Sequence, residues 1–259
     1  MSKLLWIAAV AALGMTGVTQ AETIFSDNFD GGSGDLNGTT PDTTTGANWV
    51  AGSLFNADGS TEDTQGSATL AFTPVNGSIY TLDASFSGLG LVSVADTDWF
   101  GFGFVNGQST GLDSGDRFIN GNVVGSAWML LRADQTSNPN LYGYLGNASS
   151  GIINESNISL TPTTATEIDL RLVLDTTAGV DPTSWTATWS AKRAADSSYT
   201  VVRAEQNLLT GITAVGISRS GPGITGTVES FSLTAVPEPS SAALLLGLGS
   251  IALVLRRRK

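Results

Sequence analysis

Apolar and polar residues alternate with a period of two in several stretches of residues 22–236, and this pattern limits the fold more than any other. It is clearest from Glu167 to Asp175, where Ile or Leu occupies every second position and four of the other five residues are charged. A strand with one buried face has this period, whereas a helix needs a period near 3.6. No convincing helical period occurs in this body, and Gly, Ser, Thr and Asn are abundant, so we expect an all-β domain.

The stretch from Trp99 to Phe104 predicts a strand with two unlike faces. Its three Phe side chains point to one side, while Trp99, Gly101 and Gly103 point to the other. We expect the Phe face to lie in the core. The glycine face leaves room for another backbone or a ligand ring to approach beside Trp99.

Other stretches are expected to complete about a dozen strands in two stacked antiparallel sheets. Residues 67–73 and 79–87 are expected to form a hairpin, because Asn76 and Gly77 between them favour a tight turn. The further strands are expected at residues 23–29 (as an edge strand), 122–132, 141–144, 184–191, 199–203, 214–218 and 227–233.

Residues 1–21 have the pattern of a secretory signal peptide. Lys3 precedes an apolar run from Leu4 to Leu13, and small residues lead to Thr19-Gln20-Ala21. This order predicts export and cleavage after Ala21. Residues 22–235 would then be the mature body, and their number suits one large β domain better than two small ones.

Residues 236–259 predict a separate sorting segment. Pro237 and Pro239 keep the backbone extended and remove two amide donors, so the domain is expected to end here. The apolar run that follows is expected to form a membrane-spanning helix, although its sixteen residues from Ser240 to Leu255 reach only ~24 Å. Basic side chains at its end can reach the lipid headgroups and favour the cytoplasmic side. They are Arg256, Arg257, Arg258 and Lys259.

The tail resembles the PEP-CTERM sorting signal of exported bacterial proteins, through Val236-Pro237-Glu238-Pro239, the short helix rich in Leu, Gly and Ala, and the terminal basic cluster. The resemblance implies that Pro237, Glu238 and Pro239 are recognised by exosortase, a membrane peptidase that cuts near this motif. It also implies a membrane-anchored precursor, a mature protein at the cell surface or in the extracellular matrix, and a link to exopolysaccharide and biofilm. An ordinary anchor that is never cut is the alternative.

Charge and composition exclude several classes of function. Residues 22–236 hold seven Lys and Arg against 22 Asp and Glu, a net charge of −15, which repels nucleic acid and anionic lipid. The acidic residues either bind divalent cations or keep an exported protein soluble. Cys and His are both absent, which excludes disulfides, thiolate nucleophiles, Ser-His-Asp triads and zinc sites built on Cys and His.

The body, from Phe25 to Leu233, resembles the concanavalin A-like, laminin-G-like jelly roll, a two-sheet antiparallel sandwich. The resemblance is carried by the opening Phe25–Phe29, the segment Leu36–Trp49, the Gly-Phe-Gly-Phe strand and the closing Glu229–Leu233. It implies a fold that commonly binds glycans or calcium and in some members hydrolyses polysaccharide, so the fold alone leaves the function open.

Glu167, Asp169 and Arg171 form the one candidate for catalysis, because one class of jelly-roll glycosidases carries carboxylates at alternate positions of a strand. Two carboxyl groups about 5–5.5 Å apart suit a retaining glycosidase. Here the third carboxylate of that pattern is missing, and Arg171 would hold the other two ionised, which disfavours a proton donor. We therefore expect a solvated strand face, no catalytic residues and no enzymatic activity.

Calcium is a further candidate ligand, because hard cations bind several oxygens and the loops carry pairs of Asp. Asp27 with Asp30 is the pair we would choose, although Asp in a turn usually bonds to its own backbone. No other cofactor is expected. Two more pairs are Asp96 with Asp98 and Asp113 with Asp116.

Aromatic rings beside polar groups suggest a glycan-binding face. Trp99, Trp128, Arg132, Tyr142 and Tyr144 could line one face of a sheet, although large aromatic residues also dominate sandwich cores. We therefore expect a non-catalytic glycan-binding protein. A structural or adhesion protein of the matrix without a small-ligand site is the first alternative, and a polysaccharide hydrolase is the second.

Overall fold

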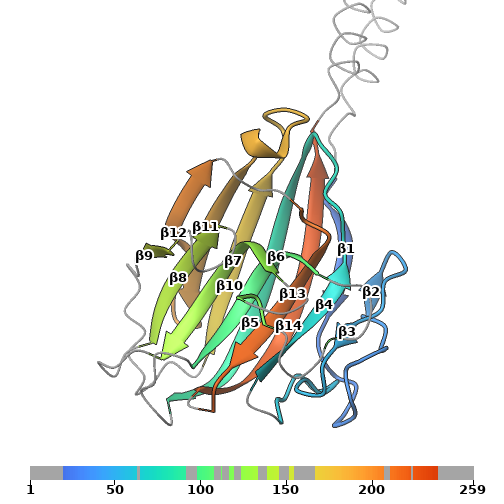
Figure 1. The fold of residues 1–259 in the computed structure, drawn as a ribbon, viewed down its shortest axis with the longest axis vertical. Coiled ribbons are helices and arrows are strands. Elements are labelled where there is room, and N and C mark those ends of the chain that lie inside the picture. Colours follow the sequence, from blue (N-terminus) through green and yellow to red (C-terminus); the bar gives the residue numbers. More distant parts are fainter. Residues whose placement is uncertain are drawn as a thin grey trace, which may run out of the picture.

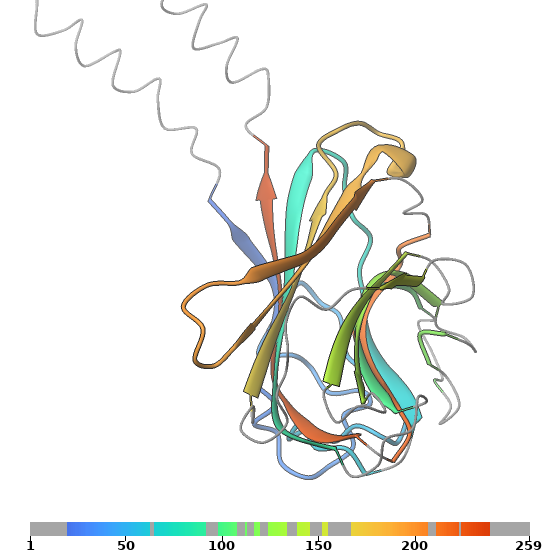
Figure 2. The same cartoon turned by 90° about the vertical axis from the view of Figure 1, so that its left-hand side faces the viewer.

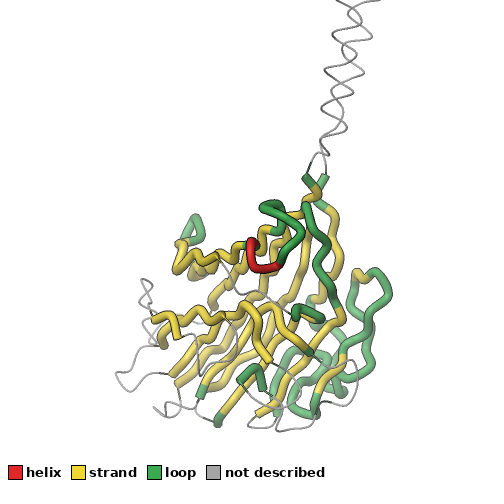
Figure 3. The backbone as a smooth tube through the Cα atoms, turned by 45° about the horizontal axis from the view of Figure 1, so that its top comes forward, coloured by secondary structure: helices red, strands yellow, loops and turns green. Residues whose placement is uncertain are grey.

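The computed structural model shows two facing β-sheets (Figure 1). The structure describes residues 20–62, 65–91, 98–107, 112, 117–119, 124–133, 139–145, 152–154, 167–206, 211–222 and 224–238. Within these ranges the one helix is the short 3-10 helix η1, Pro182–Ser184 (Figure 3). The described residues contain no helix with the length and apolar character needed to cross a membrane. The prediction of an all-β, two-sheet antiparallel sandwich is confirmed. The expected C-terminal helix and all but the end of the expected signal peptide lie outside the described residues.

The first sheet contains seven antiparallel strands in the order β12-β11-β10-β5-β14-β1-β2. The last strand of the chain, β14, lies between β5 and β1, and β2 covers the other side of β1. The N-terminal strand is therefore not the edge strand that we expected. The bounds are β1 Glu22–Asp27, β2 Thr43–Thr44, β5 Ser78–Leu91, β10 Glu167–Asp175, β11 Thr186–Arg193, β12 Thr200–Gln206 and β14 Ile224–Pro237.

The second sheet also contains seven antiparallel strands, in the order β3-β4-β13-β6-β7-β8-β9. Figure 2 shows its green and cyan strands opposite the first sheet. The bounds are β3 Val50–Ala51, β4 Gln65–Ala71, β6 Trp99–Asn106, β7 Val124–Ala133, β8 Pro139–Leu145, β9 Ile152–Asn154 and β13 Ala214–Ser220.

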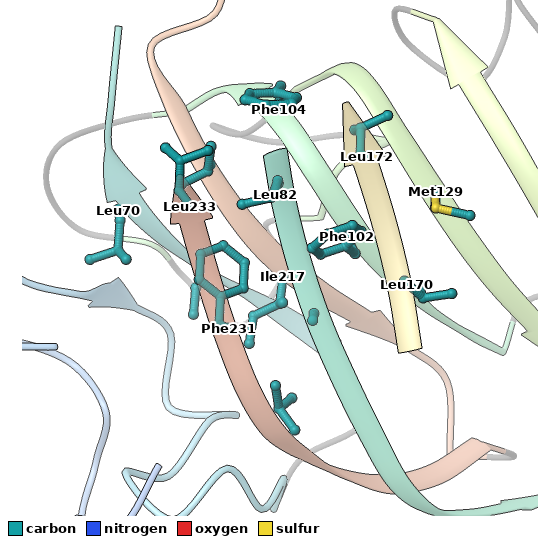
Figure 4. Packing of buried hydrophobic residues seen from close by; sticks show 14 of the residues in the cluster. Leu70, Leu82, Phe102, Phe104, Met129, Leu170, Leu172, Ile217, Phe231 and Leu233 are labelled. Carbon is teal, nitrogen blue, oxygen red and sulfur yellow. The ribbon is translucent and has the colours of Figure 1, made fainter. Parts of the chain in front are cut away.

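The hydrophobic core fills the space between the two sheets (Figure 4). The second sheet contributes Phe102 and Phe104, and the first contributes Leu82, Leu170 and Phe231, all of them buried. β10 has the predicted bounds, with its Ile and Leu residues buried and the residues between them exposed or half-buried. The alternation of apolar and polar residues therefore predicts the core face of β10 correctly.

The predicted hairpin between residues 67–73 and 79–87 is wrong. β4 pairs with β3 and β13 in the second sheet, whereas β5 pairs with β10 and β14 in the first, so residues 72–77 cross from one sheet to the other. Asn76 and Gly77 determine how sharply the backbone turns. They do not determine which strands pair with β4 and β5. Here β13 pairs with one edge of β4, and β10 and β14 pair with the two edges of β5, and these three strands are all distant in the sequence.

Candidate functional site

The outer face of the second sheet, directed away from the core, carries its own group of aromatic side chains. Because side chains alternate along a strand, the residues between the core-facing Phe side chains of β6 point to this face. β6, β7 and β8 lie side by side here, with Gly103 paired to Trp128 and Trp128 paired to Tyr144. We call the buried rings on this face the outer aromatic cluster: Trp99, Phe118, Trp128 and Tyr144.

The rings of the outer aromatic cluster pack against one another. Trp128 and Tyr144 are stacked, with centroids 4.5 Å apart and an interplanar angle of 16°. The ring of Phe118 contacts that of Trp128 edge-on, with centroids 5.8 Å apart. The ring of Trp99 is tilted against that of Trp128, also with centroids 5.8 Å apart. All four side chains are buried, so each ring is largely covered by its neighbours.

The glycine face of β6 receives these rings. A Cβ atom on Gly101 would lie 3.0 Å from Cζ3 of Trp99 and 3.2 Å from Cδ2 of Phe118. The close approach that the sequence predicts at this face is present, but the rings that approach belong to the protein itself.

Three of the five residues predicted to contact a glycan are brought together on this face, namely Trp99, Trp128 and Tyr144. Arg132 lies on β7 and Tyr142 on the neighbouring strand β8, and their side chains are outside what the structure describes. Glycan contact by these five residues stays a prediction.

Buried hydroxyl groups lie on the same face, on β4 and β13. The Ser67 Oγ donates to Ser218 Oγ at 2.9 Å, and Ser218 Oγ donates to the Gly66 carbonyl at 3.0 Å. Arg117 Nη1 donates to Ser220 Oγ at 2.7 Å. These polar residues were not predicted from the sequence, although small residues at every second position of β13 are a signal that could have indicated them.

The outer face of the first sheet carries ion pairs. Arg171 donates to both carboxylate oxygens of Asp83, from Nε at 2.7 Å and from Nη2 at 3.0 Å, and this raises the pKa of Arg171. Lys192 Nζ lies 3.0 Å from Asp169 Oδ2, and Ser85 Oγ also donates to that carboxylate. Each pair joins neighbouring strands of this sheet.

These pairs change the interpretation of the candidate catalytic residues on β10. Arg171 bonds to Asp83 rather than to Glu167 and Asp169, and Lys192 takes the place expected of Arg171 beside Asp169. Asp83 and Asp169 thus each have a basic side chain from a neighbouring strand as their partner. The geometry therefore favours the charged strand face over a glycosidase site.

Tyr199 is a half-buried aromatic residue of this charged face that our sequence analysis missed as a candidate. The guanidinium Cζ of Arg171 lies 4.2 Å from the centroid of its ring, and Lys192 Nζ lies 5.2 Å from it. Burial, followed by the charge of Asp83, raises the pKa of Tyr199 to about 12. The Tyr199 hydroxyl therefore stays protonated throughout the physiological pH range.

Asp27, the first member of the candidate calcium pair, uses both carboxylate oxygens within the protein. Its Oδ2 accepts from Trp49 Nε1 at 2.7 Å and its Oδ1 from the Phe29 amide at 2.8 Å, while burial raises its pKa. Asp30 is exposed, and of the other two pairs only Asp98 is described, as a buried residue. The described residues contain no group of three or more His, Cys, Asp or Glu that could hold a metal ion. Calcium at this pair is not confirmed.

The first residues of the sorting segment belong to the first sheet. β14 continues past Ala235, which pairs with Glu22, as far as Pro237, and the Glu238 amide donates to the Gly77 carbonyl at 2.9 Å. The sheet therefore crosses the boundary that we expected between residues 235 and 236. Exposed Ala21, the predicted cleavage residue, directly precedes β1. The other predicted processing residues, Pro239 and Arg256 to Lys259, lie outside the described residues.

Comparisons with known proteins identify the tail. Residues 235–259 match the PEP-CTERM protein-sorting motif, so the resemblance expected for this segment is confirmed. No curated protein matches the chain.

Several solved structures have a similar arrangement of strands. The metal-free carbohydrate recognition domain of Emp46p has a TM-score of 0.48 and 14% identity, covering 71% of this chain and 87% of that one. The carbohydrate recognition domain of Emp47p has a TM-score of 0.48 and 15% identity over 84% of this chain and 97% of that one. Lectin II from Ulex europaeus has a TM-score of 0.46 and 12% identity, with coverage of 84% and 98%.

Proposed function

We propose that this chain is an exported protein that exosortase processes and that acts, without catalysis, at the cell surface or in the extracellular matrix. The observation that carries the proposal is the PEP-CTERM motif at residues 235–259, which begins inside the last strand of the sandwich. Residues 1–21 would serve as the signal peptide. The apolar segment up to Leu255 would hold the precursor in the membrane until it is cut.

The processing step is tested by the mass of the mature protein. In bacteria that have exosortase, we expect a product that begins at Glu22 and lacks Leu244–Lys259, because both apolar ends would have been removed. Intact-mass measurement of the protein recovered from cells and from the medium checks this result. A mature protein that keeps Arg256 to Lys259 would count against processing and favour an uncut anchor.

We further propose that the sandwich binds glycan at the outer face of the second sheet. Aromatic rings give sugars an apolar surface, and nearby hydroxyl and guanidinium groups bond their hydroxyls. The outer aromatic cluster lies on the same face as Ser218, Ser220 and Arg117, which supports this chemistry. A link to exopolysaccharide or biofilm would follow from such binding.

A structural role in the matrix, without a small-ligand site, is the second candidate. The burial of Trp99, Trp128 and Tyr144 favours it, because rings that cover one another stabilise the sheet without needing a ligand. Binding and scaffolding therefore predict different results for the same residues.

A glycan array on residues 22–238 separates these candidates, and two matched variants locate the binding face. Tyr144→Phe removes one hydroxyl from the outer aromatic cluster and keeps its stacked ring, whereas Tyr199→Phe removes one from the opposite sheet. If the proposal holds, Tyr144→Phe should weaken glycan binding about fivefold, the value of one hydrogen bond near 1 kcal/mol, and Tyr199→Phe should not.

The outcomes of the array are distinct. A wild-type protein that binds no glycan would support the structural role. Binding that is lost in Tyr199→Phe and kept in Tyr144→Phe would move the site to the charged face of the first sheet. Release of reducing sugar from matrix polysaccharide would instead support the remaining alternative, a polysaccharide hydrolase.

A further inference from the structure

The sorting motif does not begin as a free tail, because the folded sheet holds its first four residues, 235–238. Pro237 pairs with Ser78 at the end of β14, and the Glu238 amide bonds to the Gly77 carbonyl at 2.9 Å. Neighbouring residues in a strand direct their N–H groups to opposite sides. The Pro237 nitrogen therefore faces away from β5, where its missing hydrogen costs no bond of the ladder.

The turn that holds the motif is itself fixed to a loop of the first sheet. The Gly77 amide donates to the Thr176 carbonyl at 3.1 Å, and the Ser78 amide donates to Thr176 Oγ1 at 3.0 Å. Thr176 Oγ1 also donates to the Val75 carbonyl at 2.9 Å. Residues 74–77, the loop that starts at Thr176 and the start of the motif thus form one hydrogen-bonded unit.

Both ends of the body leave from the end of the sandwich where this unit lies, which we call the exit pole. Glu22, the first residue of β1, pairs with Ala235 near the end of β14. Figure 2 shows the start of the blue strand beside the end of the red one. The exit pole comprises residues 20–23, 72–79, 175–186 and 234–238.

Exposed valines are concentrated at the exit pole. Of the four large apolar side chains that are exposed among the described residues, three lie here: Val75 at 67%, Val180 at 82% and Val236 at 37%. The fourth, Val201 at 55%, lies on the edge strand β12. Exposed apolar side chains are normal where they are scattered singly, so it is their location at one end of the sandwich that points to a contact surface here.

The charge of the exit pole favours a protein as the partner over an anionic lipid surface. Its four segments contain the acidic residues Glu22, Asp175, Asp181 and Glu238, and no Lys or Arg. Anionic headgroups would repel this pole, whereas a protein with a basic and partly apolar surface complements it.

We propose that the peptidase that processes the tail recognises the folded exit pole together with the motif, and that Val75 and Val180 are part of the recognition surface. This inference rests on the proposed processing by exosortase. A protein that binds Pro237 and Glu238 in place must approach the turn at residues 74–77, because that turn is hydrogen-bonded to the motif. The body therefore contributes to substrate choice, in addition to residues 235–259.

The test follows processing of the full-length precursor in bacteria that have exosortase, by pulse-labelling and separation of the precursor from the shorter product. The double variant Val75→Ser, Val180→Ser should be processed about fivefold more slowly, because losing apolar contact at two exposed valines costs about 1 kcal/mol or more. Val201→Ser is the matched control and should be processed at the wild-type rate. All three valines are exposed, so the substitutions leave the core unchanged.

A second precursor tests the role of the sheet in holding the motif. Four Gly and Ser residues inserted between Val236 and Pro237 separate the motif from the exit pole. In this precursor the double substitution should have no further effect on the processing rate, because the enzyme can bind the motif without touching the pole. An undiminished effect would overturn the inference.

The remaining outcomes separate the inference from the function on which it rests. Equal rates for the wild type and the double variant would overturn the inference and leave processing intact. A wild-type precursor that is never cut would overturn the proposed processing and the inference with it. A double variant that is processed normally but no longer sediments with phosphatidylcholine vesicles would assign the valines to lipid, against the inference.

Discussion

Trp128→Ala is expected to lower the free energy of unfolding by about 3–5 kcal/mol, the range for removing a large buried aromatic side chain. Trp128 is fully buried and contacts three other rings, those of Trp99, Phe118 and Tyr144. Its removal would leave a cavity on the outer face of the second sheet and would free the stacked ring of Tyr144. Equilibrium unfolding in urea, compared with the wild type, measures the loss.

Trp128→Phe is the matched control, because it keeps an aromatic ring against Tyr144 and should cost clearly less than the alanine variant. A loss below about 1 kcal/mol for Trp128→Ala would contradict the buried position, because exposed sites usually change stability by no more than about half that value. Trp128 would then be exposed in solution, where its ring could contact a sugar. The same measurement therefore bears on both candidate functions.

Gly59→Ala is expected to cost about 3 kcal/mol or more, because two separate effects act at this position. A Cβ atom there would lie 2.0 Å from the carbonyl oxygen of Val228, a contact with backbone that no side-chain rotation can relieve. In addition, the φ angle of +73° is one that residues with a side chain rarely adopt. Val228 lies on β14, so its displacement would disturb an interior strand of the first sheet, the one that joins β5 to β1.

Gly38→Ala separates the two effects. Gly38 has a similar φ angle of +81°, but a Cβ atom there would have no neighbour within 4 Å. It should therefore cost only about 1 kcal/mol, the strain of the left-handed conformation alone. Thermal unfolding of both variants provides the comparison, and equal losses would show that the contact with Val228 is relieved elsewhere.

Local patterns in the sequence predict the strands well, because the period of two is a property of each strand by itself. β10 matches the predicted residues 167–175, and the alternation from Trp99 to Phe104 correctly separates core from outer face. Strand partners depend on contacts between distant residues. That is why the Asn76-Gly77 turn was assigned to a hairpin, although it connects two sheets.

The candidate site shows a different limit of sequence analysis. Alternation placed Trp99 and Trp128 on one face, but it could not show that Phe118, from a loop, would cover them. Likewise, the spacing of Asp27 and Asp30 suggested a cation site, whereas Asp27 bonds to Trp49, which is 22 residues away. In both cases the decisive partner comes from a part of the chain that local spacing does not reach.

The structure refines what Pro237 indicates about the end of the domain. Pro237 was expected to end the domain because it lacks an amide donor, yet β14 includes it. Its nitrogen faces the side of β14 where pairing with β1 has already ended at Glu22 and Ala235. A proline is compatible with a strand at such a position.

The position of β14 between β5 and β1 determines when the body can finish folding. Without this strand, β1 and β2 have no connection to β5, β10, β11 and β12, so the first sheet remains in two parts. β14 is also the last strand to be synthesised, and on the proposed route it is the last to cross the membrane. Closure of the sheet must then wait until residue 237 has emerged, at which moment the next segment in the translocation channel is the sorting tail. Completion of the fold and arrival of the tail at the membrane would thus coincide, and a body that stalled before this point would lack the strand that joins β1 to β5.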